Sequence, residues 1–197
     1  MRRGASATLY SCLLRREDKV PDPTAAAFEL THRPVLVPVA LTSPCIALLP
    51  LPEGTVIQIL GPAARVEDVC AITDATGFSL RGNGPGQWFA VGDEPDKFAE
   101  LAATLPDGFT AIDQSHGRVR IAIEGESVGE VLAKGTGVDL ALFETGRAAT
   151  TLIGHVATHL ARISDDRFEL LVTRSFAENV WDDLKIMAAE YLGVSHE

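Results

Sequence analysis

Apolar and polar side chains alternate most clearly in the middle of the chain, between residues 118 and 124. The apolar positions Val119, Ile121 and Ile123 alternate with Arg118, Arg120 and Glu124, and only Ala122 breaks the pattern. A period of two predicts a half-buried strand.

A helical pattern follows this strand after Gly125. Val128, Val131 and Leu132 fall at i, i+3 and i+4, which is the spacing of one apolar helix face. The Ser127 hydroxyl is expected to cap this helix, and Gly135 and Gly137 are expected to end it.

The same patterns predict elements along the rest of the chain. Strands are expected at 35–37, 46–49, 55–60, 78–81, 87–91, 109–112, 150–163 and 168–173. Further helices are expected after Gly61-Pro62, from Asp93 as cap, and from Ser175 as cap. The loop Gly82–Gly86 and the pair Asp165-Asp166 are expected to turn two hairpins.

This order contains a repeat of strand, glycine, helix, hairpin and helix. One copy spans about 55–112 and the other about 113–192. We therefore predict an α+β fold of two similar repeats with antiparallel sheets, within a domain at 35–197.

The segment 1–34 is expected to be weakly structured, because Pro21, Pro23 and a charged cluster interrupt it. Its apolar residues include Leu9, Tyr10 and Phe28, which leaves two interpretations open. The segment is either a flexible terminus or a tail that lies across another surface.

Composition excludes some functions. The net charge of -10 disfavours binding to a phosphate backbone, so no nucleic-acid partner is expected. The apolar run from Val35 to Leu51 is broken by prolines and too short to span a bilayer, so no membrane anchor is expected. The widely spaced Cys12, Cys45 and Cys70 suggest reduced thiols and a cytoplasmic protein.

Two motifs resemble ligand sites but fit structural roles better. Gly82, Gly84 and Gly86 precede a strand-like segment, whereas a phosphate cradle precedes a helix, so a hairpin turn is preferred. His155 and His159 are four apart in a predicted strand, which separates them by about 13 Å and excludes a shared metal. Two solvated or interface histidines are expected instead.

The remaining polar groups show no convergence either. Asp113, Ser115 and His116 are nearly adjacent, which suits a tight polar connection better than a catalytic triad. The pairs Asp165-Asp166 and Asp182-Asp183 are expected to be solvated, and Arg174 to hold a carboxylate within the fold or on a partner. No catalytic, cofactor-binding or metal residue is therefore predicted, which is typical of a scaffold or a subunit.

Several blocks together carry a resemblance to a known family. They are Gly84-Pro85-Gly86-Gln87-Trp88, Asp113-Gln114-Ser115-His116-Gly117-Arg118, Gly135-Thr136-Gly137-Val138-Asp139-Leu140, the positions Phe143, Gly146, Thr150 and Thr151, and Arg174-Ser175-Phe176-Ala177. In this order they resemble the gamma subunit family of heterotetrameric sarcosine oxidase. The resemblance covers roughly 55–192.

The resemblance implies a non-catalytic subunit of a complex of alpha, beta, gamma and delta chains, in contact mainly with alpha. Such a complex oxidatively demethylates sarcosine to glycine, forms hydrogen peroxide and passes a one-carbon unit to tetrahydrofolate. FAD, FMN, NAD, tetrahydrofolate and zinc are expected on the other subunits. The family fold is similar to the folate-binding domain of the glycine-cleavage T-protein.

Two alternatives stay open at this point. One is a free-standing folate-binding protein that resembles an aminomethyltransferase. The other is the equivalent subunit of a related complex such as N-methylglutamate dehydrogenase, because the amine would be chosen by another subunit.

Overall fold

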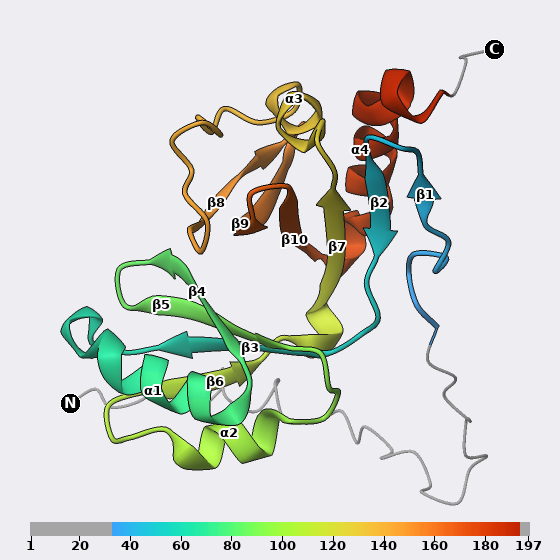
Figure 1. Cartoon of the computed structure of the whole chain (residues 1–197). Helices are drawn as coiled ribbons and strands as arrows, with labels where there is room; N and C mark the ends of the chain where they lie inside the picture. The colour runs from blue at the N-terminus through green and yellow to red at the C-terminus, as the bar shows by residue number, and fades with distance from the viewer. Residues whose placement is uncertain (1–32, 194–197) are drawn as a thin grey trace, which may run out of the picture. The chain divides into compact units, whose positions relative to one another are not determined.

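The computed structural model describes residues 33–193 of the chain, and Figure 1 shows its elements. Residues 34–193 belong to one compact unit. The predicted weakly structured segment and Cys12 thus lie outside the described residues, apart from Arg33 and Pro34 at the end of that segment.

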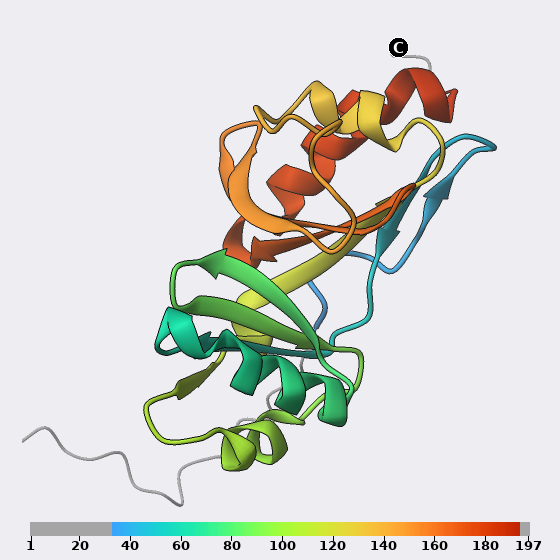
Figure 2. The same cartoon turned by 60° about the vertical axis from the view of Figure 1, so that its left-hand side comes forward.

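The first half of this unit is a four-stranded antiparallel sheet with two helices. Its elements are β3 (Thr55–Leu60), α1 (Val66–Thr76), β4 (Ser79–Gly84), β5 (Gln87–Gly92), α2 (Phe98–Thr104) and β6 (Thr110–Asp113). The strand order is β4-β5-β3-β6, which is a split βαβ arrangement. Helices α1 and α2 lie on one face of the sheet in both views (Figures 1 and 2).

The second half is a six-stranded antiparallel sheet with the order β1-β2-β7-β10-β9-β8. Its elements are β1 (Leu41–Thr42), β2 (Ala47–Pro50), β7 (Arg118–Glu124), α3 (Val128–Ala133), β8 (Ala148–Ile153), β9 (Val156–Ser164), β10 (Arg167–Thr173) and α4 (Ala177–Leu192). Short 3₁₀ turns at Ala63–Arg65, Ser115–Gly117 and Arg174–Phe176 link some of these elements. The predicted α+β class with antiparallel sheets is confirmed.

The two halves share the same order of three strands, but the strand added beside this set comes from a different part of the chain in each half. The order β4-β5-β3 in the first half matches β9-β10-β7 in the second. The remaining neighbour of β3 is β6, which lies at the end of the same repeat, whereas the remaining neighbour of β7 is β2, which precedes both repeats. The chain therefore passes between the halves twice, at 51–54 and at 114–117, and the second half is built from two separate segments around a continuous first half.

Each half has its own apolar core, and a smaller cluster joins the sheets. Ile57, Ile59, Trp88 and Ala90 pack against Val69 of α1 and Leu101 of α2. Ile121, Ile123, Phe168, Leu170 and Val172 pack against Val131 and Leu132 of α3 and Leu184 of α4. On the opposite faces, Val56, Phe89 and Val91 of the first sheet meet Leu171 of the second.

The central strand β7 is buried on both faces rather than half-buried, so that prediction is wrong. Ile121 and Ile123 face the core, and Arg120 and Ala122 on the other face are also buried. The alternation of apolar and polar residues correctly assigns side chains to the two faces of β7. The face that carries Arg120 is buried because it packs against the first half.

Two predicted strands differ in the structure. The segment 150–163 is a hairpin of β8 and β9, which turns at Gly154 with φ of 57° and His155. Residues 35–37 form no strand, although Leu36 is buried. In the predicted loop Gly82–Gly86, β4 continues to Gly84, so the turn is tighter than expected.

The three predicted side-chain caps are wrong, because helices α2, α3 and α4 begin without a cap hydrogen bond from a side chain. Asp93 binds Arg120 instead, five residues before α2 begins at Phe98. Ser127 stands at the start of α3, but its hydroxyl makes no such bond. Ser175 lies within the 3₁₀ turn that leads into α4.

Within 33–193, none of the helices is both long and apolar enough to cross a membrane.

Gly125 tests the packing of β7 against the segment before β2. Its φ is 128°, and an added Cβ would lie 2.3 Å from the Cys45 carbonyl oxygen. We expect Gly125→Ala to lower the free energy of unfolding by about 2 kcal/mol or more, measured by urea denaturation.

Gly129→Ala is the matched control for Gly125→Ala. Gly129 lies inside α3, and an added Cβ would meet no atom within 4 Å. This change is expected to stabilise the protein by about 0.5 to 1 kcal/mol through helix propensity. If both changes had the same effect on stability, the close approach of Gly125 to the Cys45 carbonyl would be contradicted.

Candidate functional site

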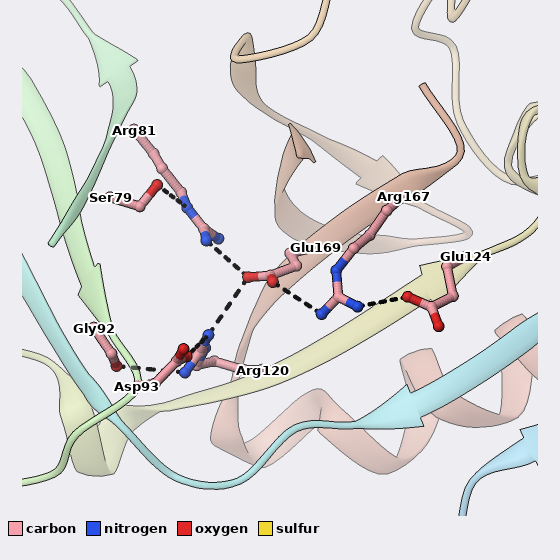
Figure 3. Close-up of polar contacts among 8 residues, drawn as sticks. All are labelled: Ser79, Arg81, Gly92, Asp93, Arg120, Glu124, Arg167 and Glu169. Atoms are coloured by element: carbon pink, nitrogen blue, oxygen red, sulfur yellow. Dashed lines mark hydrogen bonds and ion pairs between the residues drawn. The ribbon is translucent and has the colours of Figure 1, made fainter. Parts of the chain in front are cut away.

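A cluster of charged residues lies where the two sheets face each other, and it contains the three most deeply buried charges in the described chain, Arg81, Arg120 and Glu169. We call this cluster the junction network, and Figure 3 shows it together with the contacts of Ser79 and Gly92. Its members are Arg81 of β4, Asp93 after β5, Arg120 and Glu124 of β7, and Arg167 and Glu169 of β10. The network thus contains residues from both halves.

Glu169 is the centre of the junction network. Its Oε2 lies 2.7 Å from Nη2 of Arg81 and 3.6 Å from Nη2 of Arg120. Its Oε1 lies 3.3 Å from Nη2 of Arg167. One carboxylate therefore holds a guanidinium from the first half and two from the second.

Strand register explains how the members from the second sheet meet. Arg167 pairs directly with Glu124 across β10 and β7, and their side chains form an ion pair 2.5 Å long. Glu169 pairs with Ala122, which makes Arg120 its diagonal neighbour on the same face. Direct and diagonal cross-strand neighbours are within reach of long side chains.

Arg120 ties the second sheet to the end of β5 in the first. Its Nη2 donates to Asp93 Oδ1 at 2.7 Å, and its Nη1 donates to the Gly92 carbonyl at 3.4 Å. The Asp93 side chain is 92% exposed, so this carboxylate marks the point where the network reaches solvent.

Burial sets the electrostatics of the cluster. Arg81, Arg120 and Glu169 are 5%, 7% and 6% exposed. Burial by itself would raise the pKa of Glu169, but the charges and hydrogen bonds of Arg81, Arg120 and Arg167 together hold that pKa below its usual value. Glu169 is therefore ionised at neutral pH and serves as a counter-ion rather than as a proton donor.

His159 lies between the sheets beside this network. Its Nε2 is 3.0 Å from the Gly82 carbonyl oxygen, and its ring meets the Phe89 ring edge-on at 5.0 Å. Burial lowers the pKa of His159 to about 4, and the charges of Arg81 and Arg118 act in the same direction. The neutral ring thus donates its Nε2 proton to Gly82.

Of the two histidines expected to be solvated or at an interface, one is solvated and the other lies at an interface within the fold. His155 is exposed in the β8–β9 turn, while His159 is 2% exposed at the internal interface of the halves. They belong to a turn and a strand, and not to one long strand as predicted.

The glycine loop is a hairpin turn, as expected. Gly84 and Gly86 have φ of 126° and 68°, and β4 pairs with β5 across them. The Gly86 carbonyl accepts a hydrogen bond from the Gly61 backbone N–H at 3.0 Å, which fixes the turn to the end of β3.

Asp113 and Ser115 stabilise the connection between strands β6 and β7. The Ser115 hydroxyl donates to Asp113 Oδ1 at 2.6 Å and accepts from the Val56 backbone N–H at 3.1 Å. The bond with Val56 secures the 3₁₀ turn Ser115–Gly117 to β3, and the bond with Asp113 joins the turn to the end of β6. His116 is exposed within the turn. This agrees with the predicted tight polar connection.

The remaining candidates also have structural contacts. Asp165 and Asp166 form the β9–β10 turn, where they bind Thr145 and Ser164. Asp182 binds Lys185 on α4. Arg174 lies 3.3 Å from Glu53, so its expected carboxylate partner lies within the fold.

Metal ligands do not gather in the part of the chain that the structure describes, where no group of three or more His, Cys, Asp or Glu side chains converges. Cys45 and Cys70 are free thiols of intermediate exposure.

Sequence reasoning missed the junction network, although the pattern contained a signal. Arg120 and Glu169 are charged residues inside strands that are otherwise apolar on both sides, as in Val-Arg-Ile-Ala-Ile and Phe-Glu-Leu-Leu-Val. A charge in such a strand requires a buried partner. The partner residues are far away in the sequence, so only the fold identifies them.

The sequence matches a family model described as the sarcosine oxidase gamma subunit family, over residues 55–190. Among curated proteins, none matches the sequence significantly.

Solved structures show a similar fold. A chain of heterotetrameric sarcosine oxidase from Corynebacterium sp. U-96, in complex with pyrrole 2-carboxylate, has a TM-score of 0.68 and 19% identity, over 80% of this chain and 91% of that chain. A putative C-terminal regulatory domain of aspartate kinase from Porphyromonas gingivalis W83 has a TM-score of 0.46 and 10% identity, over 74% of this chain and 98% of that chain.

Removing the central carboxylate tests the junction network. We expect Glu169→Gln to lower the free energy of unfolding by about 3 to 5 kcal/mol, because the buried Arg81 loses the carboxylate it pairs with and Arg120 keeps only Asp93. Asp182→Asn is the control: its ion pair with Lys185 has side chains 63% and 43% exposed, and its loss should change stability by less than about 1 kcal/mol. Urea denaturation at pH 7 measures both, and similar small effects would contradict the assigned role.

His159 predicts a pH dependence of stability. Its pKa is about 4 when folded and 6.5 when unfolded, so above pH 6.5 it is neutral in both states and contributes no dependence. As the pH falls from 6.5 towards 4, the unfolded state takes up a proton that the folded state does not, and stability decreases. The full shift corresponds to a loss of about 3 kcal/mol.

His159→Gln keeps a side-chain N–H donor and removes this titration. Compared with wild type, the variant should lose less stability between pH 7.5 and pH 5 in urea denaturation. Parallel pH profiles for the two proteins would show that His159 does not titrate in the assigned way.

Proposed function

The chain belongs to the sarcosine oxidase gamma subunit family, and from this premise we propose that it is the gamma subunit of a heterotetrameric sarcosine oxidase. The observation that carries the proposal is the family match over residues 55–190, which runs through both halves from β3 to nearly the end of α4. The similar chain of the Corynebacterium enzyme supports it, because 91% of that chain is covered.

The proposed complex contains alpha, beta and delta chains besides this one. It removes the methyl group of sarcosine oxidatively, yields glycine and hydrogen peroxide, and passes the one-carbon unit to tetrahydrofolate. In this proposal FAD, FMN, NAD, tetrahydrofolate and zinc are held by the other chains, and the complex works in the cytoplasm.

The proposed contribution of this chain is docking, mainly to the alpha subunit. The structure is compatible with that role, because the buried charges of the junction network are engaged in joining the two sheets. Glu169 is ionised and surrounded by arginines, which suits a rigid body that presents its outer surfaces to other subunits.

Folate handling is assigned to the other chains in this proposal. The similarity of the fold to the folate-binding domain of the glycine-cleavage T-protein stays a prediction, and so does the choice of sarcosine over another N-methyl amine.

Assembly tests the proposed function. We expect tagged full-length chain, co-expressed with the alpha, beta and delta subunits of the proposed complex, to retain all three on an affinity column. The complex should form hydrogen peroxide from sarcosine, and omission of this chain should reduce the yield of active complex at least about tenfold.

Three results would overturn this proposal. If the chain retains none of the three subunits, the subunit assignment is wrong. If the isolated chain releases heat on titration with tetrahydrofolate and turns over an aminomethyl substrate, it is instead a free-standing aminomethyltransferase. Turnover of N-methylglutamate by the complex in place of sarcosine would assign the chain to the related dehydrogenase.

A further inference from the structure

A groove lies between the irregular segment 35–40, which leads into β1 at Leu41, and helix α4 on the surface of the second half. Its volume is about 430 Å³. Leu36, Val37 and Val39 line it on one side, and Glu178 and Trp181 line it on the other. We call it the α4 groove.

Two apolar residues that line the α4 groove are exposed. Val37 and Val39 are 72% and 58% exposed, and they belong to a segment without regular secondary structure. Ile186 of α4 is 62% exposed and lies one helical turn beyond Asp182, which lines the groove. Leu36 and Trp181 belong to the main core or pack against it, so the groove has an apolar floor that continues into the core.

The charge at the edge of the groove is negative. Glu178 and Asp182 lie one turn apart on α4, and both line the groove. Lys185 also lines it, but its Nζ is 2.6 Å from Asp182 Oδ1, so these two charges compensate each other. Glu178 makes no hydrogen bond or ion pair with any other residue in the range 33–193, which leaves one carboxylate for an external cation.

Together these features specify what would bind. Exposed valines beside an apolar floor favour an apolar side chain, since burial of apolar surface drives association. A carboxylate at the edge favours a cation placed next to that apolar side chain, because complementary charges fix the register of an interface. The chain has a net charge of -10, which favours a basic partner surface further.

We propose that the α4 groove receives a segment of a partner subunit whose apolar side chain packs between Val37, Val39 and Trp181 and whose Lys or Arg pairs with Glu178. This inference rests on the proposed function, because it assigns one docking surface of the subunit. It adds the location of the surface and the chemistry of the segment that binds there.

Charged substitutions in the full complex test the groove. Val37→Asp places a carboxylate on the apolar side, and Glu178→Arg reverses the charge at the edge. We expect each change to reduce the amount of partner subunit retained by tagged chain at least about tenfold, the equivalent of 1.4 kcal/mol of binding free energy. Because Val37 is 72% exposed, its replacement should leave the thermal unfolding of the isolated chain unchanged.

The chain offers a matched control for each variant. Leu142→Asp introduces the same charge at a residue that is 69% exposed and does not line the groove. Glu67→Arg reverses a charge in the first turn of α1, as Glu178→Arg does in the first turn of α4, so both lose the same favourable helix-dipole contact. Both controls should retain the partner as wild type does.

Salt gives a readout that a change in folding would not produce. Retention by the wild type should fall as the salt concentration rises, because the pair with Glu178 is screened. Retention by Glu178→Arg should instead improve with salt, since two cations then repel each other.

A crosslinker identifies the segment that binds. With p-benzoylphenylalanine in place of Val37, illumination of the complex should yield an adduct to a partner peptide that contains an apolar residue next to Lys or Arg. An adduct to a peptide without a basic residue would overturn the proposed pairing with Glu178.

The outcomes separate this inference from the proposed function. If the wild type binds no partner, the proposed function fails and the groove assignment fails with it. If the wild type binds and the groove variants bind equally well, or if the controls lose as much, the groove assignment fails and the proposed function stands. A homodimer that Val37→Asp abolishes would assign the groove to a second copy of the chain and overturn the inference.

Discussion

The carboxylate of Glu169 and the guanidinium groups around it set how the two sheets face each other. A buried carboxylate without counter-ions would be protonated or would destabilise the fold. Here Arg81 comes from the first sheet and Arg120 and Arg167 from the second, so all the charges are compensated only when both sheets are in place. The cluster thus favours one relative position over others with similar apolar contact.

The path of the chain strengthens this constraint. Strand β2 completes the second sheet before the chain builds the first, and β7 returns to the second sheet afterwards. Two connections therefore cross between the halves, and Ser115 and Asp113 secure the second of them to β3. Apolar contact between the sheets is small and centres on Phe89 and Leu171, so polar contacts supply much of the specificity.

A body held together in this way is well suited to docking. Its internal charges are engaged, its cores face inward, and the exposed apolar side chains lie on outer surfaces such as the segment at Val37. The α4 groove combines such side chains with the carboxylate of Glu178. A subunit whose role is to be bound needs surfaces of this kind more than it needs a reactive group.

Periodicity along the sequence determined the order of most elements, because the side-chain pattern of a strand or helix depends on neighbours within a few residues. It correctly separated the two faces of β7 and placed the hairpin at Gly84 and Gly86. The blocks of the chain also indicated the family, which the match over 55–190 confirms.

Only the tertiary structure decided which charged side chains are buried and which residues they pair with. Asp93 suits a helix cap by its sequence, yet it binds Arg120, which lies 27 residues away. Arg81 and Glu169 are 88 residues apart, and no local pattern relates them. Such pairs depend on how two sheets pack, and packing is a property of the whole chain, whereas propensity and periodicity are properties of short segments.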